Sequence, residues 1–272
     1  MGRGIINRAG TVELEGTGSS SSNYVVTYNG GTDNGDNSGT LRYVRVEFAG
    51  FGVAANQELN SFTFAAVGSG TTIEYLQALA GLDDHYEWFG GAVDAKYLVS
   101  YEAGDDHFDS SEGHVGRNQF LIGFQSVILP PRAGSGVISG DPQGFEIDGC
   151  GSASGSGCSA GYNSTPLNSP LFANFTMVGT GVNADVGSTS GGVGLLLRRG
   201  TAGHWVNGIL ARWPRAAISL RDTETQQRFS DGIAAVRNIY VAETGSTAAA
   251  NAPLFEGGSG RFTVDATANA IV

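Results

Sequence analysis

Residues 80–87 have the sequence AGLDDHYE, and residues 103–109 have the closely similar sequence AGDDHFD. Asp84 and Asp106 are 22 residues apart, and so are Glu87 and Asp109. A constant period of this length is typical of solenoids, in which each repeat buries its apolar face against its neighbours. The two stretches therefore predict a repeat architecture, to which the rest of the chain can be aligned.

The period limits the fold. A coil of three short strands joined by tight turns needs roughly 20 to 25 residues. A leucine-rich repeat is similar in length, but its leucine and asparagine consensus is absent here. The segments are rich in aromatic and β-branched residues, with glycine at the corners and no sustained helical period. We therefore expect an all-β fold, a single right-handed parallel β-helix with coils of 22–23 residues.

Two aromatic columns are expected inside the coils, because equivalent residues of successive coils stack about 4.8 Å apart. The first comprises Tyr75, Tyr97 and Phe120, preceded by Tyr43, and the second comprises Phe62, Tyr86, Phe108 and Phe145. Strand alternation places the neighbours of the second column on the opposite side. That side is expected to face solvent and carries Thr63, Glu87, Asp109 and Glu146.

The chain is expected to form one domain, residues 1–272. Residues 1–36 are predicted to be an irregular N-terminal coil with loops, and residues 130–170 an inserted Gly/Ser-rich surface excursion. Residues 254–272 are predicted to form closing strands. Residues 194–198 match residues 217–221 at an offset of 23, so coils resume after the excursion.

Composition excludes some classes of function. The net charge of −11 argues against nucleic acid as a partner and is compatible with bound cations. No apolar run reaches the roughly 18 residues that span a bilayer. Cys150 and Cys158 flank a Gly/Ser loop, which favours a disulfide and an oxidising, extracytoplasmic compartment over free thiols.

Residues 38–50, SGTLRYVRVEFAG, resemble a family of bacterial extracytoplasmic β-helix proteins found in Gemmatimonadetes and Bacteroidetes, mostly lipoproteins or proteins without an assigned activity. The resemblance implies the fold and an extracytoplasmic location (periplasm or cell surface) but no catalytic residue. It also implies that the chain is shortened at its start, leaving an end for a partner to cover. The further matching stretches are residues 68–73, 89–99, 144–146, 169–179 and 194–199.

The stacked acidic residues permit two interpretations. Glu87 and Asp109 are expected about 5 Å apart, the separation of the two carboxyl groups in retaining glycosidases, which suggests a polysaccharide-binding or polysaccharide-degrading enzyme. Every stacked pair in a β-helix has that spacing, however, so we favour a non-catalytic protein. Like charges on neighbouring strands repel. A hard cation, most simply Ca²⁺, is therefore expected near Asp84, Asp106, Glu87 and Asp109, the alternative being screening by water and salt.

Three histidines, His85, His107 and His114, could form a transition-metal site. We favour the alternative that His85 and His107 are solvent-facing residues of a repeated turn.

A partner surface is expected after residue 201, where Trp205, Arg212, Trp213 and Arg215 combine residue types enriched at interface hot spots. The corresponding function is a scaffold or adhesion module that binds another protein, such as the extracytoplasmic part of a membrane complex. Glycan binding by the same tryptophans is the alternative.

Overall fold

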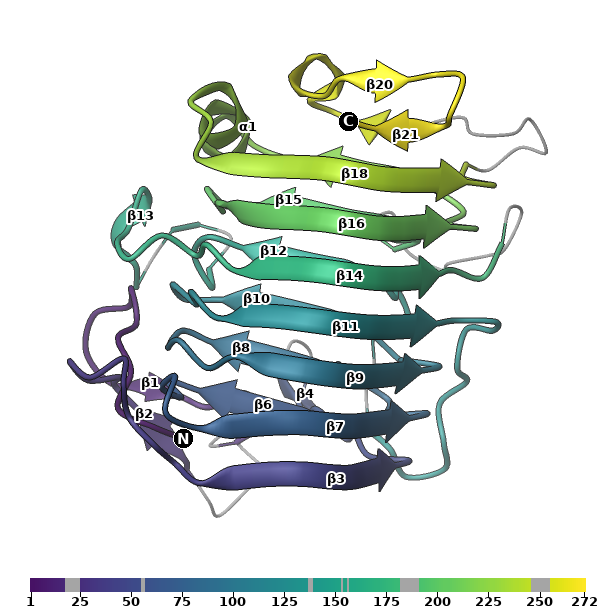
Figure 1. Ribbon diagram of the computed structural model, residues 1–272. Helices are drawn as coiled ribbons and strands as arrows, with labels where there is room; N and C mark the ends of the chain where they lie inside the picture. The colour runs from purple at the N-terminus through teal and green to yellow at the C-terminus, as the bar shows by residue number, and fades with distance from the viewer. Residues whose placement is uncertain are drawn as a thin grey trace.

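The computed structural model describes residues 1–17, 25–54, 57–136, 139–152, 154–155, 157–181, 191–245 and 255–272. Leu254, the first residue of the expected closing segment, lies outside these ranges. The described residues form a stack of coils that rises from β3 to β18 (Figure 1). Along the chain, each coil contributes a short strand to one sheet and a long strand to a second sheet, which confirms the expected parallel β-helix.

The shorter strands form a seven-stranded parallel sheet in the order β19-β17-β15-β12-β10-β8-β6. In chain order its strands are β6 (Phe62–Ala65), β8 (Tyr86–Phe89), β10 (Phe108–Ser111), β12 (Phe145–Asp148), β15 (Val193–Arg198), β17 (Ala216–Leu220) and β19 (Phe255–Glu256).

Seven long strands and the two short closing strands β20 and β21 form a nine-stranded sheet in the order β20-β21-β18-β16-β14-β11-β9-β7-β3. All its pairings are parallel except those of β21, which closes the sheet antiparallel to β18 and β20. In chain order its strands are β3 (Thr40–Glu47), β7 (Thr72–Leu79), β9 (Ala95–Tyr101), β11 (Arg117–Phe124), β14 (Leu171–Val178), β16 (Gly203–Ala211), β18 (Ala234–Ala242), β20 (Val264–Asp265) and β21 (Ala270–Ile271).

The core confirms the second aromatic column. Phe62, Tyr86, Phe108 and Phe145 stack inside the coils with successive ring centroids 5.1, 5.2 and 5.4 Å apart. These rings are buried, as the repeat predicts. Matching residues 22 or more positions apart therefore meet because parallel pairing keeps the coils in register.

The first aromatic column is stacked as expected but lies outside, so its assignment to the interior is wrong. Tyr75, Tyr97 and Phe120 have centroids 4.6 and 5.0 Å apart, yet each side chain is 38–43% exposed. Their φ angles are 56–60°, in the left-handed region. One left-handed residue shifts the alternation of side chains by one position, which turns the ring outward.

The same position bends every long strand. Tyr43, Asn174, Asn207 and Asn238 share the left-handed φ, and Asn238 donates a hydrogen bond to Asn207 across 3.2 Å. The expected three-stranded coil is thus built from one short strand and one long, bent strand. Asparagine tolerates this conformation better than a ring does, so the stacked rings must offset some backbone strain.

The excursion is held by a covalent bond. Cys150 and Cys158 form the expected disulfide, with their Cα atoms 6.1 Å apart. Cys158 pairs with Arg8 in a β-bridge, and the Ser159 N–H donates to the Asn7 carbonyl. The disulfide loop and the adjoining β13 (Ser159–Tyr162) therefore fasten the N-terminal residues to the side of the coil.

One helix was not expected. Helix α1 (Thr223–Ser230) is capped at its N-terminus by Asp222, whose side chain accepts a hydrogen bond from the Thr225 N–H. Its signal was the capping aspartate with Glu224 in the first turn and Arg228 in the last. This helix is the longest that the described residues contain, and no helix among them could cross a membrane.

Replacing Tyr97 tests whether the outer ring column stabilises the fold. Tyr97→Asn keeps a residue suited to the left-handed backbone but removes two ring stacks. We expect it to lower the free energy of unfolding by about 1–2 kcal/mol. Tyr97→Phe retains both stacks and should lie within about 0.5 kcal/mol of the wild type. Chemical denaturation measures both values, and equal stability of the two variants would contradict a stabilising role for the column.

Candidate metal centre

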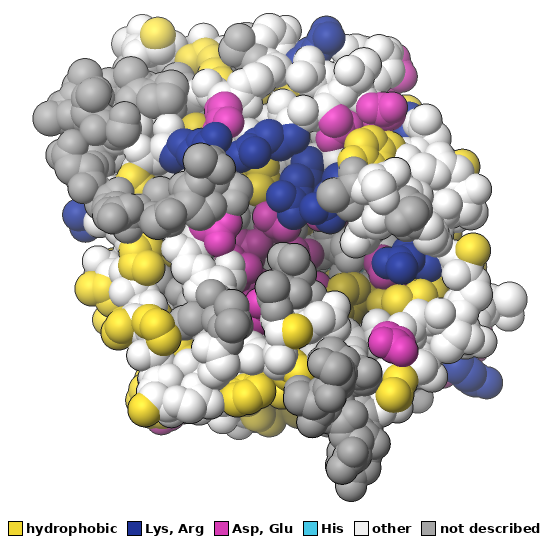
Figure 2. All heavy atoms as spheres, turned by 180° about the vertical axis from the view of Figure 1, so that it is seen from behind, with side chains coloured by type: hydrophobic (Ala, Val, Ile, Leu, Met, Phe, Trp, Pro, Cys, Tyr) yellow, Lys and Arg dark blue, Asp and Glu magenta, His cyan; other side chains and the backbone are white. Residues whose placement is uncertain are grey.

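An acidic chamber of about 660 Å³ lies on the outer face of the seven-stranded sheet. Its floor includes Glu87, Asp109 and Glu146, which are direct register partners on β8, β10 and β12. Figure 2 shows Asp and Glu side chains gathered in a hollow on this side of the molecule, with Lys and Arg side chains along one edge.

The N-terminal region covers part of this floor, so the expectation of a solvent-facing acidic ladder is wrong. Glu87 and Asp109 point away from the core, but their exposed fractions are only 5% and 8%. The cover is residues 11–17, called here the covering segment, which contains β1 (Val12–Glu13) and pairs through it with β2 (Thr27–Tyr28). β5 (Gln57–Glu58) adds to the same wall.

The lining of the chamber is strongly unbalanced in charge. Twelve carboxyl groups face three arginines, Arg8, Arg198 and Arg199. The carboxyl groups belong to Glu13, Glu15, Glu58, Asp83, Asp84, Glu87, Asp105, Asp106, Asp109, Glu112, Glu146 and Asp148. So many carboxyl groups cannot all be ionised in a half-enclosed space. Some of them must hold protons, or cations must offset their repulsion.

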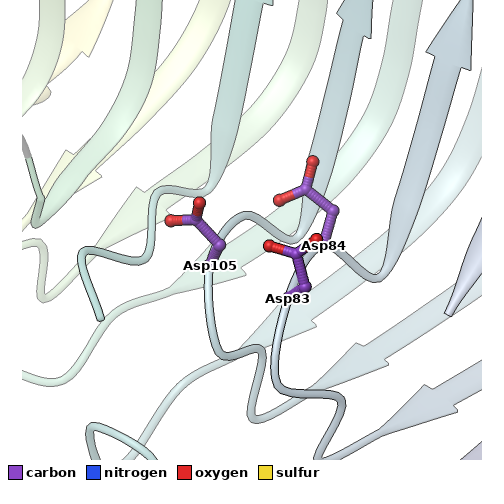
Figure 3. Close-up of side chains that lie close together, drawn as sticks. All are labelled: Asp83, Asp84 and Asp105. Carbon is purple, nitrogen blue, oxygen red and sulfur yellow. The ribbon is translucent and has the colours of Figure 1, made fainter. Parts of the chain in front are cut away.

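The carboxyl groups meet at ligand distances. Three groups have one oxygen from each member within 4.8 Å of the others, namely Asp83–Asp84–Asp105, Asp84–Glu87–Asp109 and Asp106–Asp109–Glu146. Figure 3 shows Asp83 and Asp84 on one turn and Asp105 on the next.

Of the four cation ligands expected from the sequence, Asp84, Glu87 and Asp109 form one group, whereas Asp106 belongs to a neighbouring group that shares Asp109. Sequence reasoning missed Asp83, Asp105 and Glu146, although the repeated Asp-Asp pair was the available signal for the first two.

Two of these aspartates also stitch the coils together. Asp84 Oδ1 accepts the Asp106 N–H, and Asp106 Oδ1 accepts the Gln143 N–H, both at 2.8 Å. Gln143 Oε1 continues the pattern by accepting the Val193 N–H at 2.9 Å. Asp84 and Asp106 thus have a structural role that Gln143 performs without charge. These backbone hydrogen bonds use only one oxygen of each carboxyl group.

Arginine balances one end of the chamber. Arg198 bonds Glu146 and donates to Asp148 Oδ1 at 2.7 Å, and Arg199 lies 2.6 Å from the other Asp148 oxygen. At the opposite end, the groups that act most strongly on Asp83, Asp84, Glu87 and Asp105 are other carboxyls. The positive charge therefore does not extend along the whole row.

Two buried oxygens at the chamber have no hydrogen-bond partner among the described residues. They are Asp109 Oδ1 and Ser111 Oγ, and both side chains lie on the outer face of β10. Ser111 is only 4% exposed. Buried polar atoms are nearly always satisfied, so these oxygens point to a ligand that the protein itself does not supply.

Burial and mutual repulsion raise the pKa of the clustered carboxyls. Burial is the larger cause for Asp84, Glu87, Asp106 and Asp109, whose pKa values lie well above the ordinary range. Burial also raises the pKa of Glu146 to about 7, although Arg198 opposes the rise. Such groups hold protons near neutral pH unless a cation replaces them.

The three histidines do not form the alternative metal site. His85 and His107 are fully buried inside the coil, so their expected exposure to solvent is wrong. Both ring Nδ1 atoms contact Ser100 Oγ, at 2.7 and 2.5 Å. His114 stacks on Trp88 instead. No group of potential metal ligands among the described residues includes a histidine.

The expected partner surface is also wrong in its main residues. Trp205 is fully buried and Trp213 is 1% exposed, because both rings fill the core. Neither can contact a partner protein or stack on a sugar. Arg212 remains half exposed near Glu243, at 3.6 Å, and Arg215 donates to Glu256 across 2.5 Å.

A family model described as a pectate-lyase-like β-helix domain matches residues 1–269 of the chain. Searches of curated proteins and of solved structures gave no match.

The raised carboxyl pKa values predict how pH affects the metal-free protein. Protonation of Glu15 and Glu146 stabilises the fold fully below their ordinary pKa of 4.5, and this contribution is lost as the pH rises through about 7. The buried histidines, with pKa values of about 3 for His107 and about 4 for His114, reduce stability only below 6.5.

In a chelator, the melting temperature should therefore fall between about pH 6.5 and pH 8. Saturating calcium should abolish or reverse this fall, because the ligands are then ionised throughout the range. Differential scanning calorimetry in the two buffers gives the comparison. A melting temperature independent of pH in chelator would show that the pKa values of these carboxyl groups are not raised.

Proposed function

The chain belongs to the family of pectate-lyase-like β-helix domains, and we propose that it is a non-catalytic extracytoplasmic module whose acidic chamber binds divalent cations, Ca²⁺ foremost. The observation that carries the proposal is the three sets of three carboxyl groups, which share members and lie on β8, β10, β12 and their preceding turns. Calcium takes six to eight oxygen ligands from flexible arrangements of carboxylates, carbonyls and hydroxyls, which is the chemistry of this chamber.

The extracytoplasmic location is supported by the Cys150–Cys158 disulfide, since such bonds persist in oxidising compartments. Calcium at millimolar concentration is compatible with the same setting, because extracellular modules bind it with dissociation constants of about 10⁻⁴–10⁻³ M.

The arrangement above Glu87 supports a binding role over glycoside cleavage. A glycosidase places its two carboxyl groups on either side of the scissile bond. Glu87 and Asp109 instead lie side by side on one sheet face. The Glu15 side chain of the covering segment lines the same chamber as Glu87, so it takes up space that a sugar would need.

A scaffold role would use the outer face of the nine-stranded sheet in place of the buried tryptophans. The exposed rings of Tyr75, Tyr97 and Phe120 border a groove of about 560 Å³. Their faces are stacked against one another and their edges point to solvent. Sugars stack on ring faces, so this surface suits a protein partner better than a glycan.

Cation binding is tested with Glu87→Gln, which removes from the centre of the row a carboxyl group that a cation would ionise. In chelator the variant should melt at or above the wild-type temperature, because an amide cannot ionise and so is not repelled by Glu15, Asp109 and Asp83. In calcium it should gain less than the wild type, which gains about 2.7 kcal/mol at a calcium concentration one hundred times Kd. Isothermal titration calorimetry should show at least a roughly tenfold weaker Kd for the variant.

Glu74→Gln is the matched control, since Glu74 lies on the nine-stranded sheet in a half-exposed pair with Arg42. It should bind calcium as the wild type does and change stability little. If calcium neither binds nor stabilises the wild-type protein, the proposed function is wrong.

A polysaccharide-cleaving enzyme is the second candidate. It is favoured by the family description and by Glu146, whose pKa of about 7 suits general acid–base chemistry near neutral pH. Glu146 lies at the arginine end of the chamber, next to Asp109 in the register of the sheet.

Activity on a broad glycan panel, with and without calcium, separates the two candidates. We expect no cleavage, and no change in the NMR signals of the Tyr75 and Tyr97 rings on adding soluble glycans. Cleavage that is lost in Glu87→Gln, Asp109→Asn or Glu146→Gln, but retained in Glu74→Gln, would establish the enzyme instead. Changes in the NMR signals of these rings on adding a glycan would show that the glycan binds the outer face of the nine-stranded sheet. That result would contradict a protein partner there.

A further inference from the structure

The covering segment is anchored firmly along one edge. Val12 and Tyr28 belong to a small apolar cluster with Ile6 and with Phe89 of β8. Glu112, which follows β10, receives hydrogen bonds from Tyr28 Oη at 2.7 Å and Arg8 Nη1 at 2.8 Å. None of these contacts involves a carboxyl of the three ligand groups.

The opposite edge of the covering segment meets the sheet through acidic groups. Gly16 has a φ of 68° and packs against the Glu58 carbonyl, a turn that brings the preceding Glu15 over the chamber. Glu15 lines the chamber together with Glu87 and Asp83, and its charge acts on both of them. Asn60 also donates to Glu87. A carboxyl from the cover thus abuts the carboxyl row of the sheet.

We propose that a divalent cation bound between Glu15 of the covering segment and the Glu87–Asp109 pair of the sheet cross-links the two, so that cation occupancy decides whether the chamber is closed. This inference rests on the proposed cation binding and adds a ligand, Glu15, that lies outside the repeat. The unpartnered Asp109 Oδ1 lies in the same group as Glu87, and the buried Ser111 Oγ lies on the same strand face. Both offer oxygen to a ligand there.

The cross-link has a simple physical basis. Without a cation, no positive charge holds Glu15 to Glu87, and the segment is held only along its anchored edge. A cation that takes oxygen ligands from both layers supplies this missing attraction. The anchored edge, with the Cys150–Cys158 disulfide beyond it, keeps the opened segment attached.

Hydrogen exchange of residues 11–17, followed by mass spectrometry on the full chain, measures the closure. In the wild type, calcium should slow exchange of this peptide about tenfold or more relative to chelator. In Glu15→Gln, exchange should be fast in both buffers, while calorimetry still detects calcium binding to the carboxyls of the sheet. Glu74→Gln makes the same change on the nine-stranded sheet, outside the chamber, and should behave as the wild type.

The outcomes separate the two levels of the proposal. No calcium binding by the wild type would remove the proposed function itself. Calcium binding with no change in exchange at residues 11–17, or with protection retained in Glu15→Gln, would leave that function standing and refute the cross-link. Loss of protection in Glu74→Gln as well would show that removing any carboxyl charge has this effect, and would refute a specific ligand role for Glu15.

Discussion

Parallel in-register pairing of successive coils is the constraint on which this structure depends. It places each residue directly above its equivalent at about the spacing of neighbouring strands. Columns of like residues are therefore unavoidable. For Phe62, Tyr86, Phe108 and Phe145 the column is favourable, because rings stack in the interior and bury apolar surface. For a column of carboxyls the same geometry is unfavourable, and the molecule must offset it.

Different coils offset the repulsion in different ways. Thr63 begins the column as a neutral residue, whereas at the other end Arg198 and Arg199 neutralise Glu146 and Asp148. Among the described residues, the middle of the row has neither a neutral residue nor an arginine, and its oxygens include the unpartnered Asp109 Oδ1. A bound cation would neutralise the carboxyls there, as the arginines do at the far end. This continuity connects the repeat, the burial, the raised pKa values and the proposed ligand.

The sequence could predict what the repeat controls and little of what lies outside it. The offset of 22 was sufficient for the coil, the inner rings and four of the clustered carboxyls. It misplaced Tyr75, Tyr97 and Phe120 because a tyrosine or phenylalanine gives no sign that its φ will be positive. Trp205 and Trp213 were misplaced because composition alone does not reveal orientation.

The covering segment could not be anticipated, since residues 11–17 have no equivalent in the coils. Their position depends on long-range contacts such as Tyr28 with Glu112 and Asn7 with the Gly149 carbonyl. The burial of the acidic row depends on that cover in turn. This is why a ladder that strand alternation sends outward is nevertheless enclosed.

Anomalous diffraction from crystals grown with a lanthanide in place of calcium is the most direct test of the central claim. The account predicts strong anomalous peaks in the chamber, within ligand distance of oxygens from Asp84, Glu87 and Asp109. Crystals that show lanthanide only at the molecular surface, with the chamber filled by water, would contradict it.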